Sequence, residues 1–248
     1  MQKFLGVVIL FAAALLLGAT DLPKPAIELK LNDGSGVKLK NSGSARVAAC
    51  ICMPEKTAWE AGRGDDSKAL RLNNPAADRR KRGNHACVLL PAEGRGDIDL
   101  TKPFTVGIWA RPEADIDTDG DYVLFSTFAG DHGSGLRLSY GWGALRAAFG
   151  DTKTDMSLAA PRSKFPVEKG AWNHFAAVYD GSKLQLYVNG VLAAEKPATI
   201  VAPNASTWTI GAFLNGYASP FRGSLADFRI YPVALTAEQV QAEFNRAD

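Results

Sequence analysis

The segment from Trp172 to Gly190, WNHFAAVYDGSKLQLYVNG, constrains the fold more than any other part of this 248-residue chain. Two runs rich in apolar residues meet at Asp180-Gly181, and Asn189-Gly190 ends the second run. Asp-Gly and Asn-Gly pairs favour tight turns because these residues tolerate positive φ. Alternate residues of a strand share a face, so the apolar residues of KLQLYV lie together. The segment predicts a β-hairpin with one apolar face.

Short strands separated by Gly or Asp follow the same pattern along most of the chain. Phe104–Arg111 alternates apolar and other residues. Further strands are predicted over residues 26–32, 68–73, 87–90, 122–127, 135–140, 144–149, 207–213 and 223–231. One helix is predicted at the end, with Thr236 as N-cap and Gln239 completing a capping box. Many short strands bounded by turn residues indicate a β-sandwich rather than alternating β and α units.

Three segments carry a resemblance to a known family. The hairpin resembles the W-x-H-x-A-x-V-Y-D-G…L-x-L-Y-V-N-G signature of laminin-G-like jelly-roll (concanavalin A-like) domains, and GSLADFRIYPVALTAEQV resembles their closing segment. Ala26–Asn32, followed by Asp33-Gly34-Ser35-Gly36, resembles their first strand and turn. The resemblance covers residues 26–246 and implies one all-β domain. Its expected architecture is an antiparallel two-sheet jelly-roll sandwich with a short C-terminal helix.

The N-terminus has the features of a secretory signal over residues 1–20. Lys3 precedes an uncharged apolar run from Phe4 to Leu17, and small residues follow, with cleavage expected near Ala19 or Thr20. An uncleaved anchor is the alternative, although the run is shorter than the roughly 18–20 residues that a span needs. We expect an exported protein, periplasmic, secreted or on the cell surface, with no membrane span after cleavage. The net charge of +2 does not indicate a nucleic-acid partner.

Three cysteines bear on the expected redox state. Export leads to an oxidising compartment, in which one pair can form a disulfide. Cys50 and Cys52 lie two residues apart and share a strand face, so either can reach Cys87. We take Cys50–Cys87 as the expected bridge and leave Cys52–Cys87 open.

Catalytic patterns are missing from the sequence, and we predict no enzyme activity. A retaining glycosidase needs two carboxyl groups about 5 Å apart, which an E-x-D-x-x-E run would supply on a strand, and no such run exists. His174 lies within an apolar alternation, where a core histidine is the commoner occupant. The family resemblance implies no catalytic role for it.

Two groups of acidic residues are candidates for binding Ca²⁺. Asp115, Asp117 and Asp119 precede Gly120 in the pattern of the first half of a calcium loop. A solvated acidic turn is the alternative. The family resemblance implies a second site, with Asp33 near the first turn and Asp227 in the closing strand.

Aromatic residues in two predicted turns are candidates for binding a sugar, because a ring covers C–H groups while an amide bonds hydroxyls. Packing at the edge of the sandwich is the alternative. The candidates are Tyr140, Trp142, Asn215, Tyr217 and Phe221. These features together predict a non-catalytic binding module for polysaccharide or glycoprotein. A protein–protein adhesion module is the alternative, followed by a polysaccharide hydrolase or lyase.

Overall fold

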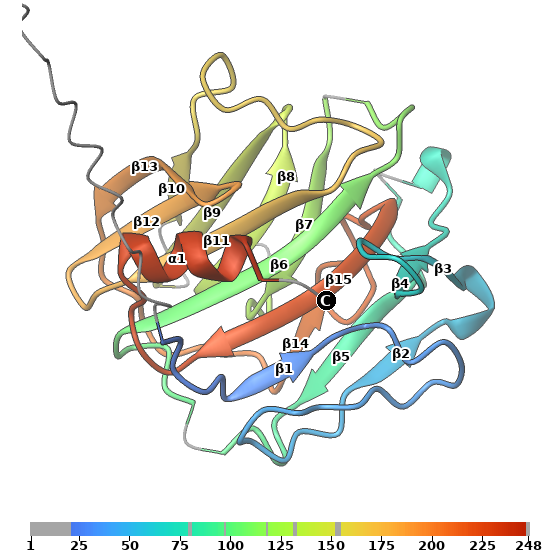
Figure 1. The fold of residues 1–248 in the computed structure, drawn as a ribbon, viewed down its shortest axis with the longest axis horizontal. Coiled ribbons are helices and arrows are strands. Elements are labelled where there is room, and N and C mark those ends of the chain that lie inside the picture. Colours follow the sequence, from blue (N-terminus) through green and yellow to red (C-terminus); the bar gives the residue numbers. More distant parts are fainter. Residues whose placement is uncertain are drawn as a thin grey trace, which may run out of the picture.

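Two antiparallel sheets packed face to face form the protein, as Figure 1 shows. The structure is a computed structural model that describes residues 21–78, 81–96, 98–117, 119–130, 133–151 and 155–246. The predicted all-β jelly-roll sandwich with a short C-terminal helix is confirmed. The predicted signal segment lies outside the described residues. Within them, no helix is long and apolar enough to cross a membrane.

The larger sheet, sheet A, follows the order β13-β12-β11-β6-β15-β4-β3, and β1 also pairs with β15. Its strands are β13 (Val191–Pro197), β12 (Lys183–Val188), β11 (Asn173–Tyr179), β6 (Phe104–Pro112), β15 (Gly223–Tyr231), β4 (Lys68–Leu72), β3 (Thr57–Ala61) and β1 (Ile27–Leu29). Short 3-10 helices cover Pro54–Lys56 and Ala76–Asp78.

The smaller sheet, sheet B, follows the order β10-β9-β8-β7-β14-β5-β2. Its strands are β10 (Asp155–Ala159), β9 (Ala144–Asp151), β8 (Ser134–Gly141), β7 (Asp121–Ser126), β14 (Thr207–Ile210), β5 (Cys87–Pro91) and β2 (Cys50–Cys52). One apolar core lies between the two sheets, and alternate residues of each strand fill it.

The hairpin that dominates the sequence forms β11 and β12, with Phe175 opposite Val188. The Asp180 carboxylate accepts backbone N–H groups from Ser182 and Lys183 at 2.8 and 2.9 Å, which holds the turn. His174 is buried beside two aromatic rings. Burial lowers its pKa to about 3, so the ring is neutral near pH 7. His174 is therefore a core residue, as predicted.

The C-terminal helix α1 (Ala237–Phe244) begins at the predicted capping box. The Thr236 hydroxyl accepts the Gln239 N–H at 3.2 Å, and the Gln239 side chain accepts the Thr236 N–H at 3.0 Å. The ring of Phe244 stacks on Trp109 of β6 at a centroid distance of 5.4 Å. The helix therefore covers part of the outer face of sheet A (Figure 1).

The register of β2 and β5 corrects the expected cysteine pairing. Cys52 lies opposite Cys87, whereas Cys50 lies opposite Leu89. All three side chains are free thiols in this structure. A hydrogen bond with Cys87 lowers the pKa of Cys52 to about 6. The same bond, together with burial, raises the pKa of Cys87.

The register predicts which thiols become linked under oxidising conditions. With oxidised glutathione, the Cys52 thiolate forms a mixed disulfide that Cys87 resolves, releasing two reduced glutathiones. Peptide mapping without reductant should find Cys52 joined to Cys87. Cys50→Ser should keep this link and Cys52→Ser should lose it, while a Cys50–Cys87 link in the unmodified chain would contradict the register.

Candidate ligand-binding surface

The turn between β8 and β9 places a large aromatic side chain in solvent. Trp142 has φ 50° and Gly143 has φ 77°, both in the left-handed region. The Trp142 side chain is 50% exposed. A bulky residue in this region costs about 1 kcal/mol or more, and such strain concentrates at functional sites. Positive φ at both central residues is what a two-residue hairpin turn requires, but Asn, Asp or Gly meets this requirement with less strain than Trp.

The alternation of β8, β9 and β10 builds a small polar surface on the outer face of sheet B. Ser139 pairs with Arg146, and Ala148 lies between Arg137 and Ser157. The intervening residues, such as Leu138 and Leu145, point into the core. Side chains from three neighbouring strands therefore meet on one rigid face.

A hollow of about 140 Å³ opens on this surface. At its edge Gly141 leaves room, because a Cβ there would lie 2.7 Å from Asp121 Oδ1 and 2.9 Å from Arg146 Cδ. The hollow is lined by Asp121, Arg137, Ser139, Trp142, Arg146, Ala147, Ala148 and Ser157.

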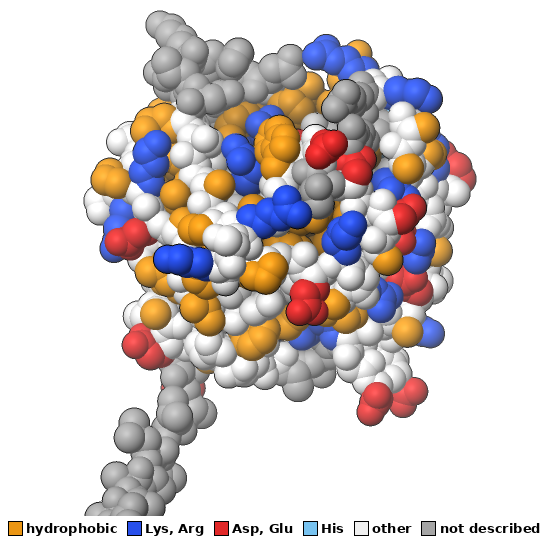
Figure 2. Space-filling view, turned by 90° about the horizontal axis from the view of Figure 1, so that it is seen from above, with side chains coloured by type: hydrophobic (Ala, Val, Ile, Leu, Met, Phe, Trp, Pro, Cys, Tyr) orange, Lys and Arg blue, Asp and Glu red, His pale blue; other side chains and the backbone are white. Residues whose placement is uncertain are grey.

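Cationic and aromatic groups alternate around the hollow. The guanidinium of Arg146 lies 4.5 Å from the centre of the Trp142 ring, and that of Arg137 lies 5.1 Å from the Phe213 ring. Arg137 and Asp121 are 3.8 Å apart. Among the described residues, Asp121 Oδ1 and Arg137 Nε are buried without a hydrogen-bond partner, which costs free energy. Figure 2 shows a similar mixture of basic and hydrophobic side chains on the face seen from above.

The structure separates the five predicted sugar contacts. Tyr140 and Phe221 are 1% and 0% exposed in the core, so neither ring can stack on a ligand. Tyr217 lies in the loop after β14 and is 44% exposed. Its ring stacks with the Arg82 guanidinium, and it does not line the hollow. Asn215 belongs to the same loop and is exposed. Of the five, the hollow includes Trp142.

The sequence analysis missed the other polar residues of the hollow. The signal was the alternation in GLRLSY and ALRAAF, which places Arg137, Ser139 and Arg146 on the face opposite the leucines. Pairing β8 with β9 in the correct register would have brought these side chains together.

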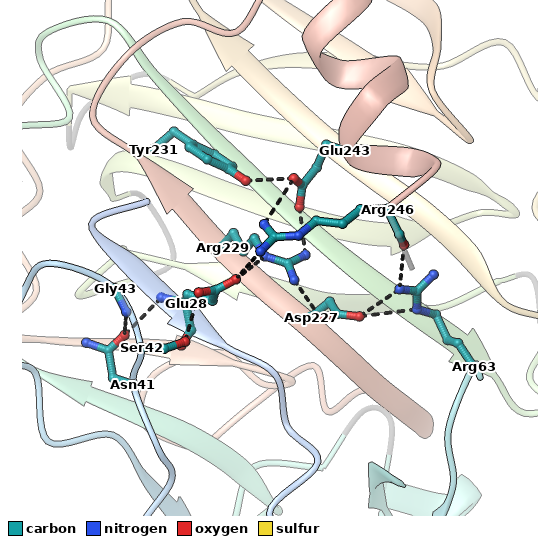
Figure 3. Close-up of polar contacts among 10 residues, drawn as sticks. All are labelled: Glu28, Asn41, Ser42, Gly43, Arg63, Asp227, Arg229, Tyr231, Glu243 and Arg246. Atoms are coloured by element: carbon teal, nitrogen blue, oxygen red, sulfur yellow. Dashed lines mark hydrogen bonds and ion pairs between the residues drawn. The ribbon is translucent and has the colours of Figure 1, made fainter. Parts of the chain in front are cut away.

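The partners of Asp227 are arginines, which makes it unsuitable as a metal ligand (Figure 3). Arg63 binds one of its oxygens at 2.8 Å and Arg229 binds the other at 2.7 Å. Two guanidinium groups oppose a divalent cation at this position.

The other proposed calcium ligands also have partners within the protein. Asp33 accepts the N–H of Lys40 at 3.0 Å, and Asp115 pairs with Arg222 at 3.2 Å. Asp117 accepts the N–H of Asp119 at 3.0 Å. Among the described residues, no group of three or more His, Cys, Asp or Glu side chains could hold a metal ion.

Asp227 belongs to a buried charge network beneath α1. Arg229 is 2% exposed and donates to Glu28 at 2.9 Å and to Glu243 at 2.7 Å. Tyr231 donates to Glu243 at 2.6 Å. Burial raises the pKa of Glu28, but hydrogen bonds from Arg229 and Ser42 outweigh it and hold that pKa below its ordinary value. These carboxylates are neutralised and enclosed, which suits a structural role.

Comparison with known proteins adds a family to this geometry. A family model described as "Concanavalin A-like lectin/glucanases superfamily" matches residues 82–241. The chain belongs to this laminin-G-like superfamily. A curated relative, mouse Pappalysin-1, is 29% identical over 171 residues, which cover 61% of this chain and 10% of that protein. This superfamily member therefore spans a small part of its curated relative.

Two sets of solved structures share the superfamily fold with this chain. The binding domain of Paraclostridial Mosquitocidal Protein 1 has a TM-score of 0.66 at 18% identity, covering 90% of this chain and 52% of that one. The binding domain of botulinum neurotoxin DC matches this chain in two structures. The TM-score is 0.63 for the structure in complex with rat synaptotagmin II and 0.62 for the structure in complex with SialylT. Both structures are 12% identical and cover 90% of this chain and 51% of theirs. The chain spans about half the length of these binding domains.

The strain at Trp142 predicts a gain of stability when the side chain is replaced. Trp142→Asn should raise the melting temperature by about 2–4 °C, because Asn tolerates the left-handed conformation and relief is worth about 1 kcal/mol. Trp142→Ala, which lacks this tolerance, is the control and should give no such gain. Calorimetry showing Trp142→Asn less stable than the unmodified chain would make Trp142 a packing residue.

The charge network predicts an acid-sensitive contribution to stability. Glu28→Gln should lower the free energy of unfolding by about 1–3 kcal/mol. Because the folded pKa of Glu28 is lowered, its contribution is present above the unfolded value of about 4.3 and lost as pH falls through the folded pKa. The melting temperatures of the unmodified chain and of Glu28→Gln, measured between about pH 7 and pH 2, should therefore converge toward low pH.

Glu195→Gln provides a matched control for Glu28→Gln. Glu195 pairs with Lys183 at 2.9 Å on the surface, where side chains of both residues are largely exposed. The Glu195→Gln variant should have the same melting temperature as the unmodified chain. A Glu28→Gln variant that behaves in the same way would show that the buried network contributes nothing measurable.

Proposed function

We propose that this chain is a non-catalytic binding module that recognises a polysaccharide or glycoprotein through the Trp142 hollow. The observation that carries the proposal is the exposed and strained Trp142 beside a polar hollow on a rigid sheet. An indole face covers the C–H groups of a sugar ring, while Ser139, Ser157 and Asp121 offer groups for its hydroxyls. The related binding domains support a binding role at the level of the fold.

The arrangement of acidic groups supports a module without catalysis. Hydrolysis of a glycosidic bond needs two carboxyl groups on opposite sides of that bond. Among the described residues, Asp121 is the one acidic residue of the hollow lining, and it already faces Arg137. The acidic side chains beneath α1 are enclosed and paired with arginine. A bound sugar at Trp142 would therefore meet recognition groups without an acid–base pair.

Export and calcium complete the proposal. The apolar run that begins at Phe4 supports export, since a module for polysaccharide or glycoprotein acts outside the cytoplasm. Calcium is proposed only for the Asp115–Asp119 loop, because Asp227 is held between two arginines. The described acidic side chains of that loop do not form a metal site by themselves, so the bound ligand would have to supply further oxygen atoms. A protein ligand is the alternative, and it becomes the conclusion if glycans fail while a partner protein binds the same hollow.

A glycan array followed by calorimetry tests the proposal. The unmodified chain should bind at least one class of oligosaccharide, and Trp142→Ala should weaken that binding by about tenfold or more, because the stacking surface is gone. The same titration with Ca²⁺ and with EDTA measures the calcium contribution. Equal binding in both would remove calcium from the proposal.

Tyr217→Ala is the matched control, because Tyr217 is also an exposed aromatic but does not line the hollow. It should bind like the unmodified chain. Loss of binding in Tyr217→Ala with normal binding in Trp142→Ala would move the site to the loop after β14. A blank array would reject the glycan proposal.

A further inference from the structure

Three arginines surround the β8–β9 turn. Arg137 and Arg146 line the hollow, and Arg162 reaches the turn from the segment after β10. That segment is held beside β9 by the hydrogen bond from the Ala160 N–H to the Leu145 carbonyl at 2.9 Å. A Cβ on Gly143 would lie 2.8 Å from Arg162 Nε, so the Arg162 side chain lies close against the turn. In this turn Trp142 exposes an indole, and Gly143 lies next to the guanidinium of Arg162.

The positive charge is only partly balanced. Among the described residues, Arg137 pairs with Asp121, whereas no ion pair involves Arg146 or Arg162. Burial raises the pKa of Tyr140, while Arg162 lowers it and Asp117 raises it, which places Asp117 near the same turn. Among the described side chains near the turn, these groups give three cations against two carboxylates. The site therefore favours an anion.

Both unpaired guanidiniums are positioned for a ligand that also stacks on the indole. Arg146 is half-buried and held at 4.5 Å from the Trp142 ring centre, so little side-chain freedom remains for a ligand to remove. Arg162 is exposed on the neighbouring segment. In an acidic pyranose the anionic group projects from the ring edge while the C–H face stacks. The Arg146 guanidinium lies over one face of the indole, so the sugar stacks on the other face with its anionic group beyond the ring edge. There the planar fork of Arg146 or Arg162 binds such a group through two hydrogen bonds.

From this geometry we infer that the unit recognised is an anionic sugar, with Trp142 under the ring and Arg146 and Arg162 bound to its carboxylate or sulfate group. The inference rests on the proposed function and names its ligand class. The hollow, at about 140 Å³, is smaller than typical small-molecule pockets. It fits one sugar unit of a longer chain, with the neighbouring units in solvent.

Calorimetry with four matched probes tests the inference on the full chain at low ionic strength. The probes are tetragalacturonate, its methyl ester, a sulfated galactotetraose and neutral galactotetraose. At least one anionic probe should bind about tenfold more tightly than its uncharged counterpart, because each charge-assisted hydrogen bond is worth more than 1.4 kcal/mol. The better anionic probe identifies the source of the charge. Equal affinity for the charged and uncharged members of both pairs would overturn the inference.

Two arginine variants separate specific recognition from bulk charge. Arg146→Gln and Arg162→Gln should each lose about tenfold in affinity for the anionic probe, a larger loss than either shows for the neutral probe. Arg46→Gln removes the same charge from an exposed position in the loop before β2 and should bind normally. An equal loss in Arg46→Gln would show that only net charge matters and would overturn the inference. Melting curves confirm that all three variants are folded.

The failures of the two proposals differ. If the neutral probe binds as tightly as the anionic ones and Trp142→Ala abolishes binding, the glycan-binding proposal stands and the anionic inference is wrong. If no probe binds and the wider array is blank, both are wrong. If the anionic probe binds but neither Arg146→Gln nor Arg162→Gln weakens it, the site assignment is wrong.

Discussion

The arrangement of the outer elements depends on the ion pairs that the buried guanidinium of Arg229 makes. Arg229 lies in β15, at 2% exposure, and a charge so enclosed costs several kcal/mol unless it is paired and hydrogen-bonded. Its partners come from β1, from its own strand and from α1. Because all three must be present at once, the first strand and the last helix are fixed to sheet A together. The network contains equal numbers of both charges, with Arg63 and Arg246 completing it.

This clamp explains a local irregularity in an otherwise regular strand. The register between β15 and β6 shifts between Ala226 and Arg229, and Asp227 has φ 48°. Asp tolerates this conformation better than most residues, and the bulge places its carboxylate between Arg63 and Arg229. The residue that the family resemblance offered as a metal ligand therefore does its work through charge pairing within the protein. A cation bound there would have to displace two guanidinium groups.

How far the sequence alone predicts this molecule depends on the range of the interactions. Local signals were sufficient for the β11–β12 hairpin and for the capping box at Thr236, because turn residues and alternation act over a few positions. Register between distant segments was not predictable. Cys87 faces Cys52 rather than Cys50 because of how β2 slides along β5, and a shift of two residues keeps the same face. The pairing of Arg63 with Asp227 joins residues 164 positions apart and leaves no local trace.

The candidate site shows, within a few residues, both what local sequence signals predict and what they do not. Tyr140 and Trp142 are two positions apart, so simple alternation places them on one face, and the sequence analysis grouped them. The strand ends at Gly141, and the left-handed turn redirects Trp142 into solvent while Tyr140 stays in the core. The turn that ends the alternation is therefore what separates a buried ring from an exposed one. Since the outer face of sheet B holds the neighbouring polar groups in register, the turn only has to position one indole against a surface that is already rigid.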